Sequence, residues 1–268
     1  MRSVEILAHR EEKKEWTGIA RRLRMAVRAT LAVSCVLACL GEYGVRAALR
    51  RMDTRAKARV LSRWSARLLE NIGVNIAVEG ELPQRGLVVS NHLSYLDILV
   101  FSAIAECVFV SKREVKSWPG IGWISSLAGT IYIDRSRPAE THAVQADMQG
   151  ALSSGMRLVL FPEGTSSDGS SVLRFHSSLF QPALELGAPI TAAAIDYSLS
   201  DGDPGQEACY WGDMKLLPHF SNLLTKTLLH VTVKFSQEHL HFRDRKEAAR
   251  TMHTQVKRLR SGSAVARG

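Results

Sequence analysis

Short apolar runs alternate with helical stretches over most of this chain. Several apolar runs are continuous, which is typical of strands covered on both faces. Seven runs have the length and residue types of β-strands: Asn75–Glu79, Leu87–Ser90, Cys107–Ser111, Thr130–Asp134, Arg157–Phe161, Ile190–Tyr197 and Val231–Phe235. Helical stretches fall near 96–105, 138–153, 178–186 and 245–260. This order predicts an α/β fold with a central, mostly parallel or mixed sheet flanked by helices.

The N-terminal part of the chain follows a different pattern. Apolar residues recur there at helical spacing, with arginines on another face: Trp16, Ile19, Ala20, Leu23, Val27 and Leu31 against Arg21, Arg24 and Arg28. The apolar run Ala29–Leu40 follows and meets Gly41 and Glu42. We expect a basic amphipathic helix that associates with a membrane.

The length of this run decides between ways of meeting a membrane. A helix over Ala29–Leu40 rises about 18 Å, against about 30 Å for the hydrocarbon core. A half-inserted segment therefore ranks first, ahead of a short tilted span and of a buried soluble helix. An export signal is a further alternative, although the acidic residues upstream do not suit one.

The domain organisation follows from these patterns. Residues 46–72 have a helical composition and end at Gly73. We expect a basic, helical, membrane-associating region over 1–67, a catalytic domain over 68–260 and a tail over 261–268.

Charge and cysteine content narrow the class of protein. The net charge of +9 is uneven, because residues 1–67 carry +10, residues 68–233 carry −7 and residues 234–268 carry +6. Basic ends suit an anionic membrane surface or a nucleic acid, and neither interleaved aromatics nor zinc-finger spacing supports the nucleic acid. Four scattered cysteines exclude a disulfide framework and favour a reducing compartment.

A histidine and an aspartate five positions apart give the first candidate chemistry. His92 follows the expected strand Leu87–Ser90, at the kind of strand end where α/β folds place reacting groups. If Asp97 folds back to one ring nitrogen, the other nitrogen can take a proton, so the pair predicts a general base. The alternative is a loop histidine with a capping aspartate.

A second motif follows another expected strand. In the run Phe161–Thr165, Gly164 allows close approach of the backbone, and its N–H and that of Thr165 could face an anion, while Glu163 could orient a hydroxyl or brace the loop. Two cations at strand ends, Arg135 and Lys112, suit phosphate recognition. Each of these has a plain structural alternative as a turn or a surface charge.

The nucleophile elbow, the P-loop and the H-E-x-x-H zinc motif do not occur in the sequence. A histidine base without a covalent nucleophile suits direct attack by the hydroxyl of an acceptor. A hydrolase that activates water through His92, and a non-catalytic module that binds membrane or nucleic acid, are the rival hypotheses.

Taken in order, these residues resemble the motifs of the glycerolipid acyltransferases of the PlsC type. The segment 91–97 resembles their N-H-x-S-x-x-D motif, Gly129–Arg135 the second motif, Phe161–Thr165 the third and Ala188–Ile190 the fourth. The resemblance implies transfer of an acyl group from acyl-CoA or acyl-carrier protein to a lysolipid hydroxyl at a membrane surface, on the cytoplasmic face. It assigns His92 as base with Asp97 as partner, and Arg135, Lys112 and the loop 163–165 to substrate binding. It implies no metal, no cofactor and no nucleic acid.

Two departures from the family pattern affect the expected acceptor. Phosphatidate-forming members usually carry Arg after Glu-Gly-Thr, where this chain has Ser166, and the usual Phe-Lys is Phe175–His176, in which a protonated His176 could partly replace the lysine. We place 1-acyl-sn-glycerol-3-phosphate narrowly first as acceptor, in phospholipid biosynthesis. Lyso-ornithine lipid or another lysolipid is the alternative, because the segment 209–219 resembles members that act on such lipids.

Overall fold

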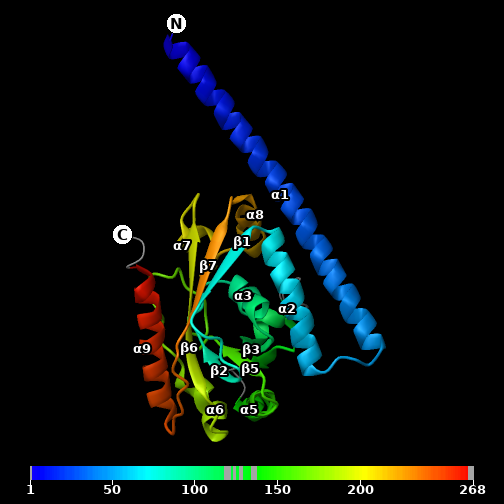
Figure 1. The fold of residues 1–268 in the computed structure, drawn as a ribbon, viewed down its shortest axis with the longest axis vertical. Helices are drawn as coiled ribbons and strands as arrows, with labels where there is room; N and C mark the ends of the chain where they lie inside the picture. Colours follow the sequence, from blue (N-terminus) through cyan, green and yellow to red (C-terminus); the bar gives the residue numbers. More distant parts are fainter. Residues whose placement is uncertain (1, 118–121, 123–124, 127–128, 134–137, 265–268) are drawn as a thin grey trace.

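The computed structural model describes residues 2–117, 122, 125–126, 129–133 and 138–264. Its centre is a seven-stranded sheet with the strand order β1-β7-β6-β2-β5-β3-β4 (Figure 1). The strands are β1 (Val74–Glu79), β2 (Gly86–Val89), β3 (Cys107–Lys112), β4 (Ile131–Ile133), β5 (Arg157–Leu160), β6 (Ile190–Leu199) and β7 (Leu229–Phe235). All neighbours are parallel except β6 and β7. The predicted α/β fold with a mixed sheet is confirmed.

Helices cover both faces of this sheet. The longer ones are α1 (Arg2–Ala48), α2 (Thr54–Asn71), α3 (Leu96–Ile104), α5 (Pro138–Ser153), α8 (Leu216–Thr225) and α9 (Arg245–Ala264). Shorter turns are η1 (Arg113–Ser117), η2 (Ser177–Phe180), α6 (Gln181–Glu185) and α7 (Pro204–Glu207). Elements α1, α2, α3 and α8 share one core with the sheet, and α5, α6 and α9 share the other.

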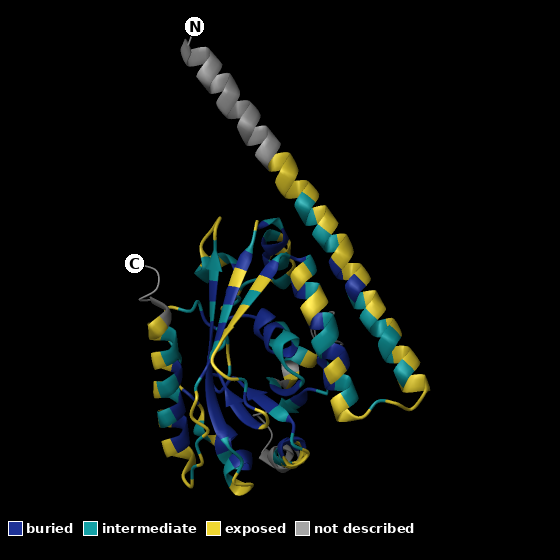
Figure 2. Ribbon diagram, viewed as in Figure 1, coloured by how far each residue is buried: buried dark blue, intermediate teal, exposed yellow. Residues whose placement is uncertain are grey.

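The strands are buried because their side chains point alternately into these two cores. Val88 of β2 belongs to the core on the α3 side, whereas Leu87 and Val89 belong to the core on the α9 side. Figure 2 shows the central strands in the colour of buried residues. This explains why the apolar runs are continuous, and each of the seven expected strands is present with its ends shifted by a few residues.

The N-terminal helix is longer than the sequence suggested. Gly41 and Glu42 do not end it, and α1 continues to Ala48. The Glu42 carboxylate accepts hydrogen bonds from Arg46 of its own helix and from Arg63 and Trp64 of α2. Glu42, which the sequence suggested as a helix end, therefore forms a contact between α1 and α2.

The single helix expected over 46–72 is instead parts of two helices. The helix is interrupted between Ala48 and Thr54. The Asp53 side chain caps the start of α2 by accepting from the N–H of Ala56. Helix α2 then runs across the expected boundary between residues 67 and 68 and packs on α3. The division into domains stays a prediction, and residues 265–268 of the expected tail lie outside the described residues.

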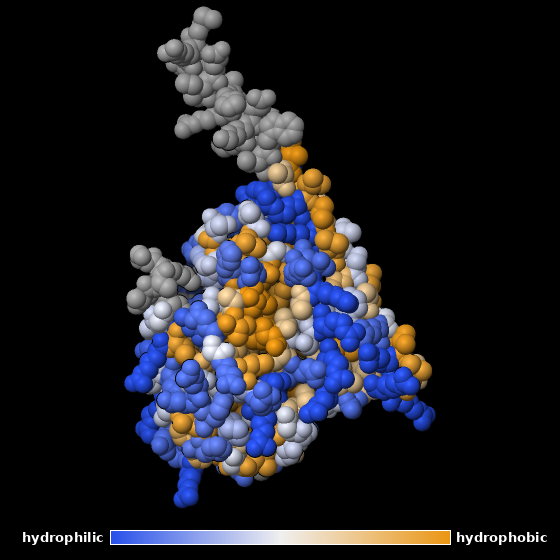
Figure 3. All heavy atoms as spheres, in the orientation of Figure 1, coloured by the Kyte–Doolittle hydropathy of each residue, from blue (hydrophilic) through white to orange (hydrophobic). Residues whose placement is uncertain are grey.

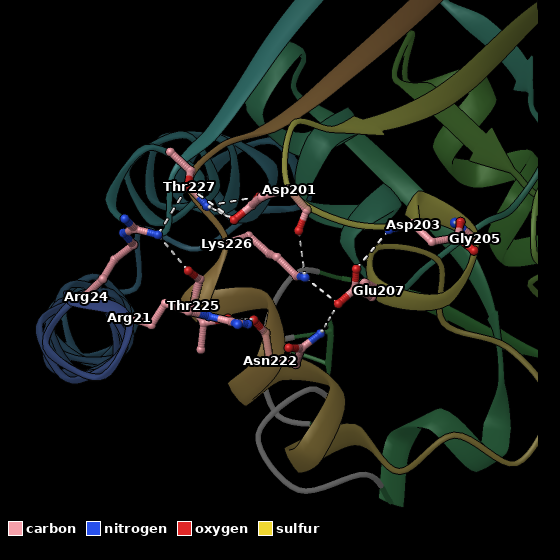
Figure 4. Close-up of polar contacts among 10 residues, drawn as sticks. All are labelled: Arg21, Arg24, Asp201, Asp203, Gly205, Glu207, Asn222, Thr225, Lys226 and Thr227. Carbon is pink, nitrogen blue, oxygen red and sulfur yellow. Dashed lines mark hydrogen bonds and ion pairs between the residues drawn. The ribbon is translucent and has the colours of Figure 1, made fainter. Parts of the chain in front are cut away.

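The arginines of α1 form hydrogen bonds to the rest of the domain, as the close-up in Figure 4 shows for Arg21 and Arg24. Arg24 donates to the carbonyl of Thr225 over 2.7 Å and Arg28 to that of Lys226, both at the end of α8. Lys226 is itself buried and pairs with the Glu207 carboxylate. Cations at a helix C-terminus satisfy its last carbonyls, so the basic side of α1 fastens this helix to the domain.

The apolar side of α1 is left uncovered. Ile19, Leu23, Val27 and Leu31 remain 41–64% exposed, and Figure 3 shows apolar side chains along this helix. Within the described residues, the stretch Gly18–Ala48 is the one helical segment long and apolar enough to cross a membrane. An uncovered apolar stripe of this length suits contact with lipid.

Candidate active site

The loop after β2 places His92 beside Asp97. The Nδ1 atom of His92 lies 2.7 Å from Oδ2 of Asp97, as the spacing predicted. The side-chain amide of the preceding Asn91 forms two hydrogen bonds of 2.9 Å with the backbone of Ile195 in β6. These bonds fix the loop to the edge of the neighbouring strand in the sheet. A fixed loop of this kind fixes the direction of the imidazole.

Asp97 is fully buried in the first turn of α3, where a negative charge is favoured by the helix N-terminus. Its Oδ2 atom also accepts from the backbone N–H groups of Leu93, at 2.7 Å, and Ser94, at 3.2 Å. Its Oδ1 atom accepts from the hydroxyl of Tyr197. Four donors therefore surround one carboxylate, which compensates for its removal from water.

Tyr197 is a member of this site that sequence reasoning missed. It lies on β6, 100 residues after Asp97, and burial together with the Asp97 carboxylate holds the pKa of its phenol well above the ordinary value. A phenol that keeps its proton is a permanent donor to Asp97. Only the placement of β6 beside β2 could have revealed this contact.

The imidazole of His92 stacks on Phe161, with the ring centroids 4.4 Å apart and the planes 15° apart. Phe161 is the first residue of the motif Phe161–Thr165, so this motif and the His92 motif meet as expected. Because Asp97 accepts from Nδ1, the lone pair lies on Nε2, which has no hydrogen-bond partner among the described residues. This nitrogen is available to take a proton.

The loop after β5 is bent sharply at Gly164. This residue has a φ of +70°, and its N–H donates to the carbonyl of Phe161 over 3.1 Å. The expected role of the Gly164 N–H as an anion ligand is therefore not seen, since the N–H closes the turn. Thr165 is exposed next to it, and its N–H donates to no partner among the described residues.

Glu163 does not line the cavity that contains His92. Its side chain is buried, and neither carboxyl oxygen makes a hydrogen bond of normal geometry to a described residue. Burial raises the pKa of Glu163 to about 8, the Asp97 carboxylate adds to the rise, and the nearby N–H groups of Leu173 and His92 offset part of it. This position suits bracing of the loop more than contact with an acceptor.

The cavity next to His92 has a volume of about 250 Å³. Strand ends and neighbouring helices give it an apolar wall, formed by Ile98, Phe109, Val110, Val115, Ile133, Leu160, Phe161 and Leu179. The other lining residues are mostly polar or aromatic: Ser111, Gly164, Thr165, Ser166, Tyr210, Trp211 and Gly212. A cavity with a base, an apolar wall and a polar wall can hold an acyl chain and a hydroxyl-bearing molecule together.

Three further expected positions have different outcomes. Lys112 ends β3 directly after Ser111, which lines the cavity, and Arg135 lies outside the described residues. His176 lines a separate cleft with Arg174 and Arg250, so it does not meet His92 in one cavity. Among the side chains that the structure describes, no group of three His, Cys, Asp or Glu residues is placed to hold a metal ion.

Comparison with known proteins bears on the chemistry of this site. The profile of the Acyltransferase family matches residues 50–196. The chain is 35% identical over 208 residues to lyso-ornithine lipid O-acyltransferase of Pseudomonas aeruginosa, which covers 76% of this chain and 80% of that protein. It is 34% identical over 140 residues to 1-acyl-sn-glycerol-3-phosphate acyltransferase of Neisseria gonorrhoeae, covering 49% and 55%.

A solved structure shares the fold. The crystal structure of the 1-acyl-sn-glycerophosphate acyltransferase PlsC from Thermotoga maritima matches with a TM-score of 0.67. The match covers 90% of this chain and 95% of that chain at 21% sequence identity. At this identity the match concerns the fold, including the seven-stranded sheet and its flanking helices.

Proposed function

The chain belongs to the acyltransferase family, and we propose that it transfers a fatty acyl group from a thioester to the hydroxyl of a lysolipid. The observation that carries this proposal is the contact of 2.7 Å between His92 and the buried Asp97 at one end of an apolar cavity. A base beside an apolar cavity, with a free ring nitrogen, can activate the hydroxyl of a molecule that brings its own lipid chain.

The reaction needs one proton transfer in each direction. The Nε2 atom of His92 takes the proton of the acceptor hydroxyl while the oxygen attacks the thioester carbonyl carbon. The carbon–sulfur bond then breaks, and the imidazolium returns the proton to the leaving thiolate. Asp97 accepts from Nδ1 throughout, which stabilises the imidazolium. We assign binding of the oxyanion to the exposed N–H of Thr165.

Two acceptors are named among the relatives. We propose lyso-ornithine lipid first, because the relative of that name is matched over 80% of its length, against 55% for the relative named after 1-acyl-sn-glycerol-3-phosphate. The short side chain of Ser166, which donates to the carbonyl of Tyr210, also leaves no charge for a phosphate at this position. The glycerol phosphate, ranked first from the sequence, becomes the second candidate.

The donor and the location are part of the same proposal. The donor is acyl-CoA or acyl-carrier protein, since both present a thioester, and Arg135 and Lys112 would bind substrate. Helix α1 touches the domain at Arg24 and again at Glu42, so it lies along the domain and offers its apolar side to lipid. This favours a helix in the plane of the membrane interface over a spanning one, on the cytoplasmic face where the thioester donor is made.

A transfer assay tests the proposed function. Purified protein with labelled acyl thioester and a panel of lysolipids should form a diacyl product, and His92→Ala should lower the rate by a factor of about 10²–10⁴. His230→Ala, at an exposed position on β7, is the matched control and should keep full activity. Full activity in His92→Ala would contradict the assignment of the base.

A further inference from the structure

A segment outside the part matched by the family profile forms one wall of the active-site cavity. The profile ends at residue 196, and residues 209–214 follow between α7 and α8. Tyr210, Trp211 and Gly212 of this segment line the same cavity as His92. The rest of the cavity lining lies within residues 50–196, so this wall is the part that the shared profile leaves open.

The segment is fastened to both catalytic loops. The N–H of Tyr210 donates to the carbonyl of Leu93 over 2.8 Å, next to His92. The hydroxyl of Ser166 donates to the carbonyl of Tyr210, so the loop after β5 holds the same residue from the other side. A wall bonded at one residue to both loops keeps a fixed position relative to the base.

Contacts within the segment set the direction of its side chains. The indole N–H of Trp211 donates to the carbonyl of Gly205 over 2.9 Å, and the Tyr210 hydroxyl donates to the carbonyl of Met214 over 2.8 Å. Gly212 has a φ of +59°, a conformation that glycine adopts without strain. The rings are therefore placed by the backbone, which is what a recognition surface requires.

The chemistry of the wall points to the kind of group that it meets. The apolar lining residues of the strands suit a hydrocarbon chain, whereas Tyr210 and Trp211 add aromatic rings to the same cavity. Aromatic rings attract ammonium groups through the negative charge of their faces, and position 166 beside them carries a serine, which offers no positive charge to a phosphate.

We propose that the segment Cys209–Met214 is the acceptor-binding wall of the enzyme, and that Tyr210 and Trp211 select lysolipids with an amine-bearing headgroup over those with a phosphate monoester. The proposal rests on the lysolipid acyltransferase function above. Ser166 is then a positioning residue, because its hydroxyl holds the carbonyl of Tyr210.

The experiment compares two acceptors at one donor concentration. For wild-type protein and for Trp211→Ala and Trp211→Phe, kcat and KM are measured with lyso-ornithine lipid and with 1-acyl-sn-glycerol-3-phosphate. Loss of a cation–π contact should lower kcat/KM for the amine-bearing acceptor about tenfold in Trp211→Ala, mainly through KM. The value for the phosphate-bearing acceptor and the KM of the donor should change less than about twofold.

Controls separate this proposal from the function on which it rests. Phe220→Leu changes an aromatic residue near Tyr95 that does not line the cavity, and it should keep the wild-type acceptor ratio. A rise in the donor KM, or an equal loss for both acceptors in a folded Trp211→Phe protein, overturns the proposal. So does a wild-type preference for the phosphate-bearing lipid, whereas a wild-type protein that acylates no lysolipid overturns the proposed function itself.

Discussion

Two buried carboxyl groups lie near the active site, and they differ in the number of hydrogen-bond donors around them. Asp97 has no exposed surface and accepts from four donors, three of them N–H groups and one the Tyr197 hydroxyl. Glu163 is nearly as buried, and its oxygens make no hydrogen bond of normal geometry within the described part of the chain. One site is built around a negative charge, and the other around a neutral acid.

This difference indicates different roles for the two acids of the motifs. A carboxylate with four donors can remain charged while its histidine gains and loses a proton. An acid whose pKa is raised to about 8 by burial is mainly protonated at neutral pH, so it fills space behind the Gly164 turn without adding a second charge beside Asp97. The comparison predicts that substitutions at the two positions differ in kind.

The largest effect is expected for Asp97→Asn. The amide can present an N–H to Nδ1 of His92, which leaves the proton on Nε2 and removes the base. We expect kcat to fall by a factor of about 10³–10⁴, by analogy with the aspartate of serine protease triads. Steady-state transfer assays measure this, with circular dichroism to establish that the variant is folded.

Glu163→Gln serves as the matched control for that experiment. It makes the same chemical change at the other buried acid, and kcat should stay within about threefold of the wild-type value. Equal losses in the two variants would show that both acids act in the reaction, and that Glu163 does more than fill space.

An intermediate effect is expected for Tyr197→Phe. The change removes one of the four donors to Asp97, and a hydrogen bond to a charged group contributes about 1.5–3 kcal/mol. The unfolding free energy should fall by an amount of that order. Because three donors remain, kcat should fall only about tenfold, with the KM of both substrates unchanged, and Tyr95→Phe is a control on a hydroxyl that does not reach Asp97.

A rise in KM instead of a fall in kcat would contradict the positioning role of Tyr197. In that case the phenol would act on substrate binding, although it is buried behind Asp97 and does not line the cavity.

The smallest effect concerns stability as a function of pH. The pKa of Glu163 is raised in the folded protein, so between about 4.5 and 8 the folded state holds a proton that the unfolded state has lost. The free energy of unfolding should therefore decrease as pH rises through this window, by at most about 1.4 kcal/mol per pH unit from this group. In Glu163→Gln this contribution is absent, and urea unfolding at pH 5 and pH 8 measures the difference.

Glu81→Gln, at an exposed glutamate, should retain the wild-type dependence on pH. If the free energy of unfolding of Glu163→Gln depends on pH as it does in Glu81→Gln and the wild type, Glu163 is ionised in the folded protein. The proposed difference between Glu163 and Asp97 would then be wrong.

The sequence predicted the fold well because the strands are covered on both faces. Continuous apolar runs mark such strands, and the four ordered motifs identified the family, as the comparisons confirm. The helix boundaries were harder, since Glu42 looks like a helix end until Arg63 and Trp64 of another helix are placed beside it. Tertiary contacts decide such positions.

The site was predictable where its parts are close in the chain or belong to the ordered motifs of the family, as for the stacking of Phe161 on His92. His92 and Asp97 are five residues apart, so a loop and one helical turn suffice to bring them together. Tyr197 reaches the site through the position of β6 in the sheet, and Tyr210 is held there by its bond to the carbonyl of Leu93; no local pattern encodes either contact. The burial of Glu163 and the bonded N–H of Gly164 depend in the same way on how the loop folds onto its neighbours.

The strand order also sets the sequence in which the chain can assemble. One half of the sheet, β2-β5-β3-β4, can form once residue 160 has been made, but β1 pairs with β7, and Arg21 of α1 meets Thr225, 204 residues later. Closing such long loops is slow because their entropy is lost before the contacts form. The contact of α1 with α8 can therefore form only after about 200 further residues have been made, whereas the contact of α1 with α2 through Glu42 needs only the next helix.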